Sequence, residues 1–591
     1  MAAGRPDAPE LSLRKAFLWT EIFRTFHIAL KPEKLVVAAV GILAMSLGWF
    51  VLSMLFYSKA PDRNDESRYG AKVVQDTVGT KKSDGVEYTA ADLIIQADRL
   101  YKKDLEDWKL LDAMAGPNGR LRTLPWYEYR GPNPYLLITS FAGGNAAEIK
   151  ATAGDFLIGT TPVLVEPLFK LLLPIVKIVD PDASPLTRLY LFLCLMWGIV
   201  VWAFFGGIIT RLAAVELTGK ERTSLKGAVQ FVVDRYIHYI LSPSAPIAII
   251  LVMMLAMMLV GFVALIPFVG EILIYGLGLP FLILGGIAMA VVMVGLIAYP
   301  MMYPTLSTEG TDTFDAFSRS YSYIFQAPWS YLWYWLVAIA YGAVVTLFVL
   351  FIGSLAVYMA KWSVSQAPLT EYTNRKPDYL FQYTPETFGW KELMLKGGPL
   401  ELTERSKKDE LTGRVVRTYE TANPAIADEY KLGTYWYGRI GAGMASFWMV
   451  LLLLAMIGFS YSYFWSAATM IYLLMRKKVD ETELDELFVE EKPFAPADLP
   501  PPMPAAPSTM TGLPMVPPPM PSAAMPSAPM PSAAGLPPMP LAPMPVTVEV
   551  PKAMPVSAMP PATMPVSAMP PATMPPATMP TSKPDDESKA E

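Results

Sequence analysis

Residues 302–335 read MYPTLSTEGTDTFDAFSRSYSYIFQAPWSYLWYW and join two long apolar runs. The apolar spacing over 312–326 predicts an amphipathic helix, with Asp312 and Asp315 in a first turn where carboxylates favour the helix dipole. Pro328 ends this helix, because proline cannot continue the helical hydrogen-bond ladder. The next apolar run opens at Trp329. A helix, then a proline, then an apolar run is therefore the unit from which we interpret the rest of the chain.

The composition indicates an integral membrane protein. The chain has 591 residues, of which 53% are hydrophobic and 17% are charged, whereas about a quarter of the residues of a soluble protein are charged. Its apolar residues gather in runs near the roughly twenty residues that a bilayer core requires. The net charge of −5 comes with no basic patch, so no nucleic-acid partner is expected.

Cysteine and histidine are too scarce for the common metal sites. Cys194 is the only cysteine and lies inside an apolar run, which excludes a disulfide or a thiolate metal site within one chain. His27 and His238 are far apart in the sequence. We expect no catalytic residue, no metal ligand and no cofactor, and therefore a protein that is not an enzyme.

Six apolar runs predict an all-α fold with six transmembrane helices. The first begins too late and is too long for a signal peptide, and no convincing cleavage site accompanies it, so it should remain as an anchor. The expected parts, in chain order, are 1–34 (cytoplasmic amphipathic helix), 35–57 (span 1), 58–186 (extracytoplasmic loop domain), 187–209 (span 2), 210–245 (cytoplasmic amphipathic linker), 246–303 (hairpin of spans 3 and 4), 304–328 (cytoplasmic amphipathic linker), 329–358 (span 5), 359–439 (extracytoplasmic loop), 440–474 (span 6) and 475–591 (cytoplasmic tail, acidic and then Pro/Met-rich).

The orientation follows from Lys and Arg near the span ends, which favour the cytoplasm. These residues gather before span 1, after span 2 and after span 6. Six spans place all three segments on one side, so both termini are predicted to be cytoplasmic. The two long loops then fall outside, because long loops translocate largely regardless of their charge.

The loops show local structure. Residues 88–114 predict a helix with Thr89 as its cap, and 413–419 predict a short strand. Residues 162–178 are apolar with three prolines, and Glu166 and Lys170 share one stripe that should face water. We interpret 162–178 as an interfacial segment, with a membrane crossing as the alternative.

The C-terminal tail is of low complexity. The decamer PVSAMPPATM fills 555–564 and repeats at 565–574. A segment of Pro, Met and Ala cannot bury enough surface to fold and is expected to be disordered. Its methionines could bind Cu(I) through their thioethers, but a flexible tail that docks a partner, or serves as a spacer, is preferred.

Three segments can be aligned as an internal repeat. They run from 16 to 32, from 228 to 243 and from 316 to 328, and each ends in a proline before an apolar run. One interpretation is a collar of amphipathic helices at the cytoplasmic surface, which grips lipid or a partner. The other is chance similarity at sites where any interfacial helix must turn.

Several long stretches resemble an uncharacterised family of large multi-span membrane proteins from planctomycete bacteria. They read ITRLAAVELTGKERTSLKGAVQF, IPFVGEIL, PWYEYRGPNPYLLIT and FSYSYFWSAATMIYLLMRKKVDETELDEL, together with the opening stretch. The resemblance covers most of the chain up to about residue 490 and not the Pro/Met tail. It implies a bacterial inner membrane and no activity. More distantly, the order of helix and span is similar to the membrane domain of some glycerophosphodiester phosphodiesterases.

A few residues are candidates for interaction. Glu271 could bind a cation or a proton, or could simply be exposed to water at the turn between spans 3 and 4. Gly276, Gly278 and Pro280 could break span 4, as in transporters with discontinuous helices. Tyr323 and Trp329 belong to an aromatic cluster that suits a membrane interface better than a ligand cage.

We interpret Glu128 and Arg130 as a structural ion pair or as exposed residues. The preferred function is a non-enzymatic scaffold or assembly component that contacts lipid, other membrane proteins or its own copies. A permease or channel with a broken span 4 is the first alternative, and an accessory subunit of a membrane complex is the second.

Overall fold

The computed structural model describes residues 17–78, 88–117, 119–128, 130–141, 163–220, 223–367, 377–398, 400–408, 415–432 and 435–488. The chain divides into two units, Met1–Ala495 and Pro496–Glu591. The second unit, which holds most of the predicted disordered tail and its repeated decamer, lies outside the described residues, as does the start of the predicted N-terminal helix.

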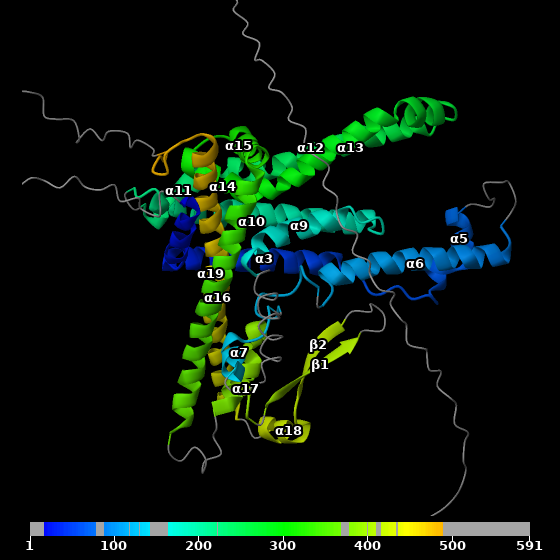
Figure 1. Ribbon diagram of the computed structural model, residues 1–591. Helices are drawn as coiled ribbons and strands as arrows, with labels where there is room; N and C mark the ends of the chain where they lie inside the picture. Colours follow the sequence, from blue (N-terminus) through cyan, green and yellow to red (C-terminus); the bar gives the residue numbers. More distant parts are fainter. Residues whose placement is uncertain are drawn as a thin grey trace, which may run out of the picture. The chain divides into compact units, whose positions relative to one another are not determined.

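The predicted all-α class and the number of candidate spans are confirmed for the described residues. Six helical segments are long and apolar enough to cross a membrane (Figure 1). They are α3 (Pro32–Phe56), α10 (Pro185–Leu217), α12 (Tyr236–Ala264), the continuous segment Leu279–Glu309, α16 (Pro328–Ser365) and α19 (Trp436–Val479). Leu279–Glu309 consists of α13 (Leu279–Gly295), η3 (Leu296–Ala298) and α14 (Tyr299–Glu309).

Shorter elements connect these helices. They are η1 (Leu18–Arg24), α2 (Thr25–Ala29), α4 (Glu66–Tyr69), α5 (Ala71–Val78), α6 (Ala90–Ala115), α7 (Pro134–Phe141), α9 (Glu166–Ile178), α11 (Leu225–Asp234), η2 (Val269–Leu277), α15 (Thr313–Gln326), η4 (Pro377–Phe381), η5 (Thr387–Gly389), α17 (Trp390–Leu395), β1 (Leu402–Lys408), β2 (Val415–Thr421) and α18 (Pro424–Leu432). The strands β1 and β2 pair antiparallel, with Leu402 opposite Thr421 and Lys408 opposite Val415.

Local sequence signals account for several of these elements. The predicted helix near 88–114 is confirmed as α6, and Thr89 and Asp92 form a capping box at its start. The helix predicted in the opening stretch is confirmed as α15, where the Asp312 side chain accepts a hydrogen bond of 2.9 Å from the Asp315 amide. In both cases a short polar side chain satisfies an amide that has no partner within the helix.

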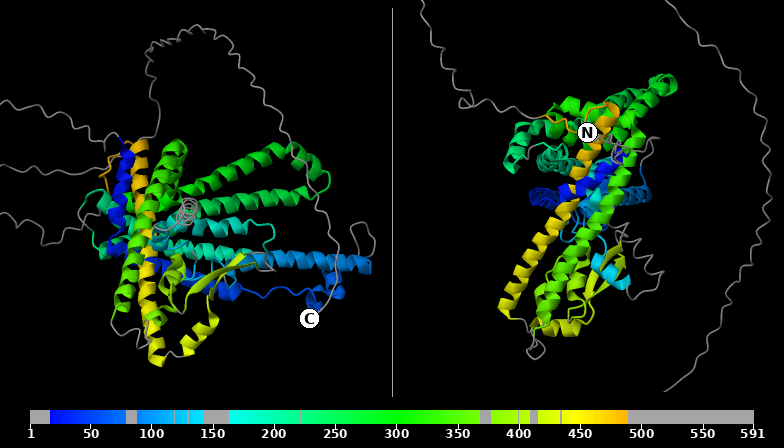
Figure 2. Two further views of the ribbon diagram at one scale, coloured as in Figure 1. Left: turned by 60° about the horizontal axis from the view of Figure 1, so that its bottom comes forward. Right: turned by 60° about the vertical axis from the view of Figure 1, so that its left-hand side comes forward.

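The buried centre of the fold is the C-terminal half of α19 rather than the opening stretch. Every residue from Met456 to Arg476 is buried, and α19 packs against α3, α10, α14 and α16. Figures 1 and 2 show α16 and α19 side by side. A run of apolar and small residues reads the same in sequence whether protein or lipid surrounds it, which is why the sequence analysis did not single it out.

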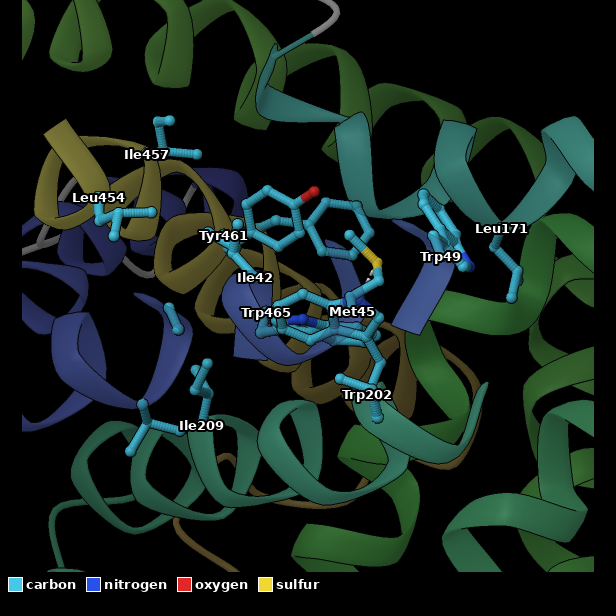
Figure 3. Close-up of a cluster of buried hydrophobic side chains, with 14 of the residues drawn as sticks. Ile42, Met45, Trp49, Leu171, Trp202, Ile209, Leu454, Ile457, Tyr461 and Trp465 are labelled. Atoms are coloured by element: carbon cyan, nitrogen blue, oxygen red, sulfur yellow. Dashed lines mark hydrogen bonds between the residues drawn. The ribbon is translucent and has the colours of Figure 1, made fainter. Parts of the chain in front are cut away.

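Aromatic residues fill this centre. Figure 3 shows Tyr461 and Trp465 of α19 beside Trp202 of α10 and Met45 of α3. The rings of Trp202 and Tyr461 stack with centroids 4.8 Å apart, and the indole of Trp202 donates to Met45 Sδ at 3.0 Å. Trp465 also stacks on Tyr303 of α14 at 5.0 Å. One cluster of side chains therefore joins four of the six long helices.

The hairpin of α12 and α13 is the opposite case. Its two helices pack against each other, yet no side chain in the most apolar window of α12 is buried within the protein. Such an extensive exposed apolar surface is expected of a segment that lipid surrounds.

The proposed internal repeat is only partly reflected in the helix boundaries. Pro32 is the first residue of α3 and Pro328 is the first residue of α16, so these two helices begin at proline, as predicted. The second segment differs, because Pro243 lies inside α12 and the chain breaks earlier, at Arg235. A proline in a long apolar helix is tolerated where neighbouring groups satisfy the freed carbonyl.

Candidate functional site

A cavity of about 450 Å³ lies where the ends of α10, α14 and α19 come together with α15. We call it the polar cavity. Its walls are polar or charged except at two positions near the last described residues. The lining residues are Lys220, Thr308, Glu309, Arg319, Arg476, Thr482, Glu486, Leu487 and Phe488.

Glu309, at the end of α14, organises the charges of the polar cavity. Its carboxylate lies 2.7 Å from Arg319 Nη1 and 3.6 Å from Arg476 Nη1, and it also accepts a hydrogen bond from the Tyr472 hydroxyl. One carboxylate therefore positions two guanidinium groups that belong to different helices.

Arg319 is held in its charged form. Burial alone would lower the pKa of Arg319, but its hydrogen bond to Asp315 and the nearby charge of Glu309 outweigh burial and raise this pKa. The Asp315 contact measures 3.0 Å and spans one turn of α15. The cation is therefore permanent at any pH at which the protein folds.

The segment 480–488, which we call the strap, forms one wall of the polar cavity. Arg476 Nη2 donates to the backbone oxygens of Glu483 at 3.2 Å and Glu486 at 2.7 Å. The Tyr323 hydroxyl donates to the Asp480 carboxylate. The strap is thus held mainly through its backbone, at two points soon after α19 ends.

Phe488 attaches the end of the strap to α14 and α10. Its amide donates to Thr308 O at 2.8 Å, and its carbonyl accepts from both terminal nitrogens of Arg211 at 3.1 Å. Its ring covers Gly310, where a Cβ atom would come within 2.5 Å of the ring and where φ is +63°. Glycine suits this position on both grounds.

A hydroxyl network lies behind the polar cavity. Ser307 Oγ is 2.7 Å from both Thr210 Oγ1 and the Tyr239 hydroxyl, which links α14 to α10 and α12. Arg211 adds a hydrogen bond of 2.6 Å to Ser307 O and lies 3.9 Å from the centroid of the Phe231 ring. The base of the cavity is therefore fixed by groups from four helices.

A second group of charges, which we call the buried ion cluster, consists of Glu128, Arg130, Glu166, Lys170 and Tyr461. Arg130 bonds Glu166 through two nitrogens at 3.1 and 3.0 Å and also pairs with Glu128. Lys170 lies 2.6 Å from Glu166 and 3.1 Å from Glu128. The Tyr461 hydroxyl donates to Glu166 at 3.1 Å, so the cluster ties α9 and the residues Glu128 and Arg130 to α19.

The buried ion cluster corrects one expectation and confirms another. Glu166 and Lys170 do not face water, as the sequence analysis expected, because both are drawn inward by partners near residue 130. The spacing of four residues is the same on either face of a helix, so it could not decide between them. The structural ion pair of Glu128 and Arg130 is confirmed.

This cluster has the features of a structural ion network rather than of a reaction site. Two carboxylates balance two cations, and the adjoining void, which Lys170 and Trp49 help to line, measures about 10 Å³, roughly the space of one water. Burial alone would raise the pKa of Glu166, but Arg130 and Lys170 outweigh it and hold that pKa well below its usual range. Glu166 therefore stays ionised, as a structural group.

This arrangement predicts a pH dependence of stability. Because the folded pKa of Glu166 is below the unfolded value of about 4.3, its contribution is complete above about pH 5 and is lost as the pH falls further. We expect the midpoint of thermal unfolding to drop between about pH 5 and pH 3. The Glu166→Gln variant should show a shallower drop in that range, whereas Glu106→Gln, at a half-exposed position, should follow the unmodified protein.

The candidate residues from the sequence lie at different places. Glu271 is exposed and accepts a hydrogen bond of 2.6 Å from the Phe268 amide, in a turn where Phe268 has a φ of +71°. Gly276, Gly278 and Pro280 lie beside it, where η2, a π-helix, gives way to α13. None of these four residues lines either cavity described above.

The two aromatic candidates are also separated. Tyr323 is buried beside the strap, and its burial, followed by its hydrogen bond to the Asp480 carboxylate, raises its pKa. Trp329 is 82% exposed at the start of α16, as suits a residue at a membrane interface. The structure thus places Tyr323 against the strap, through Asp480, although Tyr323 does not line the polar cavity itself.

The Glu271 contact can be tested by removing the acceptor. The Glu271→Ala variant should destabilise the turn by about 1 kcal/mol, because the Phe268 amide then loses its partner. The expected result is faster amide hydrogen exchange in 268–277. Glu271→Gln keeps a side-chain oxygen and should exchange more slowly than the alanine variant; equal rates would contradict a capping role.

Comparison with known proteins gives no match among protein families, curated proteins or solved structures.

Proposed function

We propose that this protein is a non-enzymatic scaffold or assembly component of the bacterial inner membrane, with both termini in the cytoplasm. Its membrane body would hold the Pro/Met-rich tail at a fixed point, and the tail would dock a partner. Lipid and other membrane proteins would contact the exposed faces of the long helices. The resemblance to planctomycete proteins supports the bacterial membrane and adds no activity.

The observation that carries this proposal is the attachment of Phe488. Both its amide and its carbonyl are bonded to the body, through Thr308 and Arg211. The Pro/Met-rich sequence begins within ten residues of this point. A tail that binds nothing does not require such an attachment. A tail that docks a partner benefits from it, because a fixed starting point raises the effective concentration of the docking segment near the membrane.

The contacts between helix ends support the proposed topology. Lys34 at the start of α3 lies 2.9 Å from Glu216 at the end of α10. Arg211, also near the end of α10, bonds Ser307 in α14 and Phe488 after α19. All these ends were assigned to the cytoplasmic side, so an alternating path with six crossings agrees with them.

We prefer a scaffold to a permease because of the surroundings of the broken segment. The backbone changes from π-helix to α-helix at Gly278, but the flanking Leu277 and Leu279 are exposed. Broken helices of transporters line a central binding site, and neither described cavity includes this segment. An accessory subunit of a membrane complex would have the same features as a scaffold, and the two differ only in the proteins that they bind.

The experiment replaces the tail. In one variant of the full chain, a Gly/Ser-rich segment of equal length replaces residues 496–591. In a matched variant, the same residues 496–591 are present but their sequence is reversed. We expect the variant with the Gly/Ser tail to insert into the membrane normally. Crosslinking in intact cells should no longer link this variant to its specific protein partners. An unchanged set of partners, or transport of solutes by the purified protein in liposomes, would overturn the proposal.

A further inference from the structure

The lining of the polar cavity carries one cation more than it carries carboxylates, although Arg319 also pairs with Asp315, outside the lining, at 3.0 Å. Lys220, Arg319 and Arg476 contribute three cations to its lining, and Glu309 and Glu486 contribute two carboxylates. Glu309 is shared by the two arginines. Among the residues that the structure describes, Lys220 has no carboxylate within ion-pair distance, and its side chain is exposed to solvent.

Arg476 is a second residue of the cavity lining that could interact with an anion, because some of its hydrogen-bond donors are unsatisfied. Only 5% of this residue is exposed, and within the described part of the chain its Nε has no hydrogen-bond partner. Its Nη1 is 3.6 Å from Glu309, which is too long for a hydrogen bond. A buried guanidinium with unused donors is costly, so an added acceptor at this place would be stabilising.

The size and the donor types indicate what could fill the space. A volume of about 450 Å³ falls within the usual range of small-molecule sites, about 300–1,000 Å³. Arginine presents a planar fork of donors and lysine a compact charge, and both bind phosphate strongly. Here they approach from the ends of α10 and α19 and from α15.

We propose that the polar cavity binds a phosphate group, carried by an acidic phospholipid or by a free phosphate. Lys220 and Arg476 would contact its oxygens, with Glu309 keeping Arg319 and Arg476 in place. This site is independent of whether the tail binds a partner, so it goes beyond the function proposed above.

Glu486 allows specific binding of phosphate to be distinguished from a general attraction between opposite charges. It lines the cavity from the strap, and its carboxylate would oppose a bound phosphate. Removing that charge should tighten binding, whereas removing Lys220 should weaken it. Both residues are exposed, so neither change is expected to disturb the fold.

The test uses the full-length protein with two probes. Inorganic phosphate is titrated into lipid-free protein in detergent, and its binding is followed by calorimetry. Separately, protein reconstituted in phosphatidylcholine, with or without phosphatidylglycerol, is extracted and its retained lipid is measured by native mass spectrometry. Binding in the first arm alone assigns the site to free phosphate, and retention in the second alone assigns it to a lipid headgroup.

We expect Lys220→Ala to weaken binding about tenfold and Glu486→Gln to strengthen it. Lys478→Ala is the matched control, because Lys478 is an exposed lysine near the same end of α19 but outside the cavity lining. An equal loss with Lys478→Ala would show non-specific charge attraction and would overturn the proposal. The absence of binding in both arms would do the same.

Discussion

Replacing Arg130 with methionine is expected to lower the free energy of unfolding by about 3–5 kcal/mol. The change removes the guanidinium that bonds Glu166 twice and pairs with Glu128, and it leaves two carboxylates with Lys170 alone. Unpaired charge in a buried site costs far more than an exposed ion pair contributes. The thermal unfolding of protein in detergent, followed by intrinsic tryptophan fluorescence, would measure the loss.

Arg120→Met is the matched control, since Arg120 is exposed and lies only ten residues earlier. It should change stability by less than about 0.5 kcal/mol. Adding Glu166→Gln to Arg130→Met should recover part of the loss, because one of the two stranded carboxylates becomes neutral. If the two arginine variants unfolded at the same temperature, the buried ion cluster would not stabilise the fold as we describe.

Replacing Trp465 with alanine should be comparably destabilising, by about 3–5 kcal/mol. Trp465 is fully buried and stacks on Tyr303, and it also packs near Trp202. The truncation opens a cavity among helices that cannot close around it without moving α14 or α10. The same thermal unfolding measurement applies.

Trp448 provides a comparison within the same helix. It is 65% exposed on α19, so Trp448→Ala removes the same side chain without opening a cavity. A small effect at 448 and a large one at 465 would agree with the C-terminal half of α19 as the buried centre. Similar effects at both positions would argue that packing along α19 is uniform.

Features with a local cause could be predicted from the sequence. The long apolar runs follow from composition over twenty residues, and the described part of the chain forms six such helices. The start of α15 at Asp312 and the capping box at Thr89 each depend on residues at most three positions apart. Such signals are contained in one short window, so no knowledge of the tertiary fold is needed.

The polar cavity and the buried ion cluster could not be predicted in this way. Arg130 and Glu166 are 36 residues apart, and Arg211 and Phe488 are 277 residues apart. No periodicity links such pairs. The nearest signal for the cavity in the sequence is the acidic stretch that begins at Asp480, four residues after Arg476, and its composition indicates only a tail.

The three hydrogen bonds of the Phe488 backbone also determine how the molecule would respond to tension. A pull on the chain beyond this residue would first load the hydrogen bonds to Thr308 and Arg211. The force would then pass into α14 and α10, both of which are packed on their neighbours, before it reached the last turn of α19. The strap therefore spreads a mechanical load over three helices and protects the end of α19 from fraying.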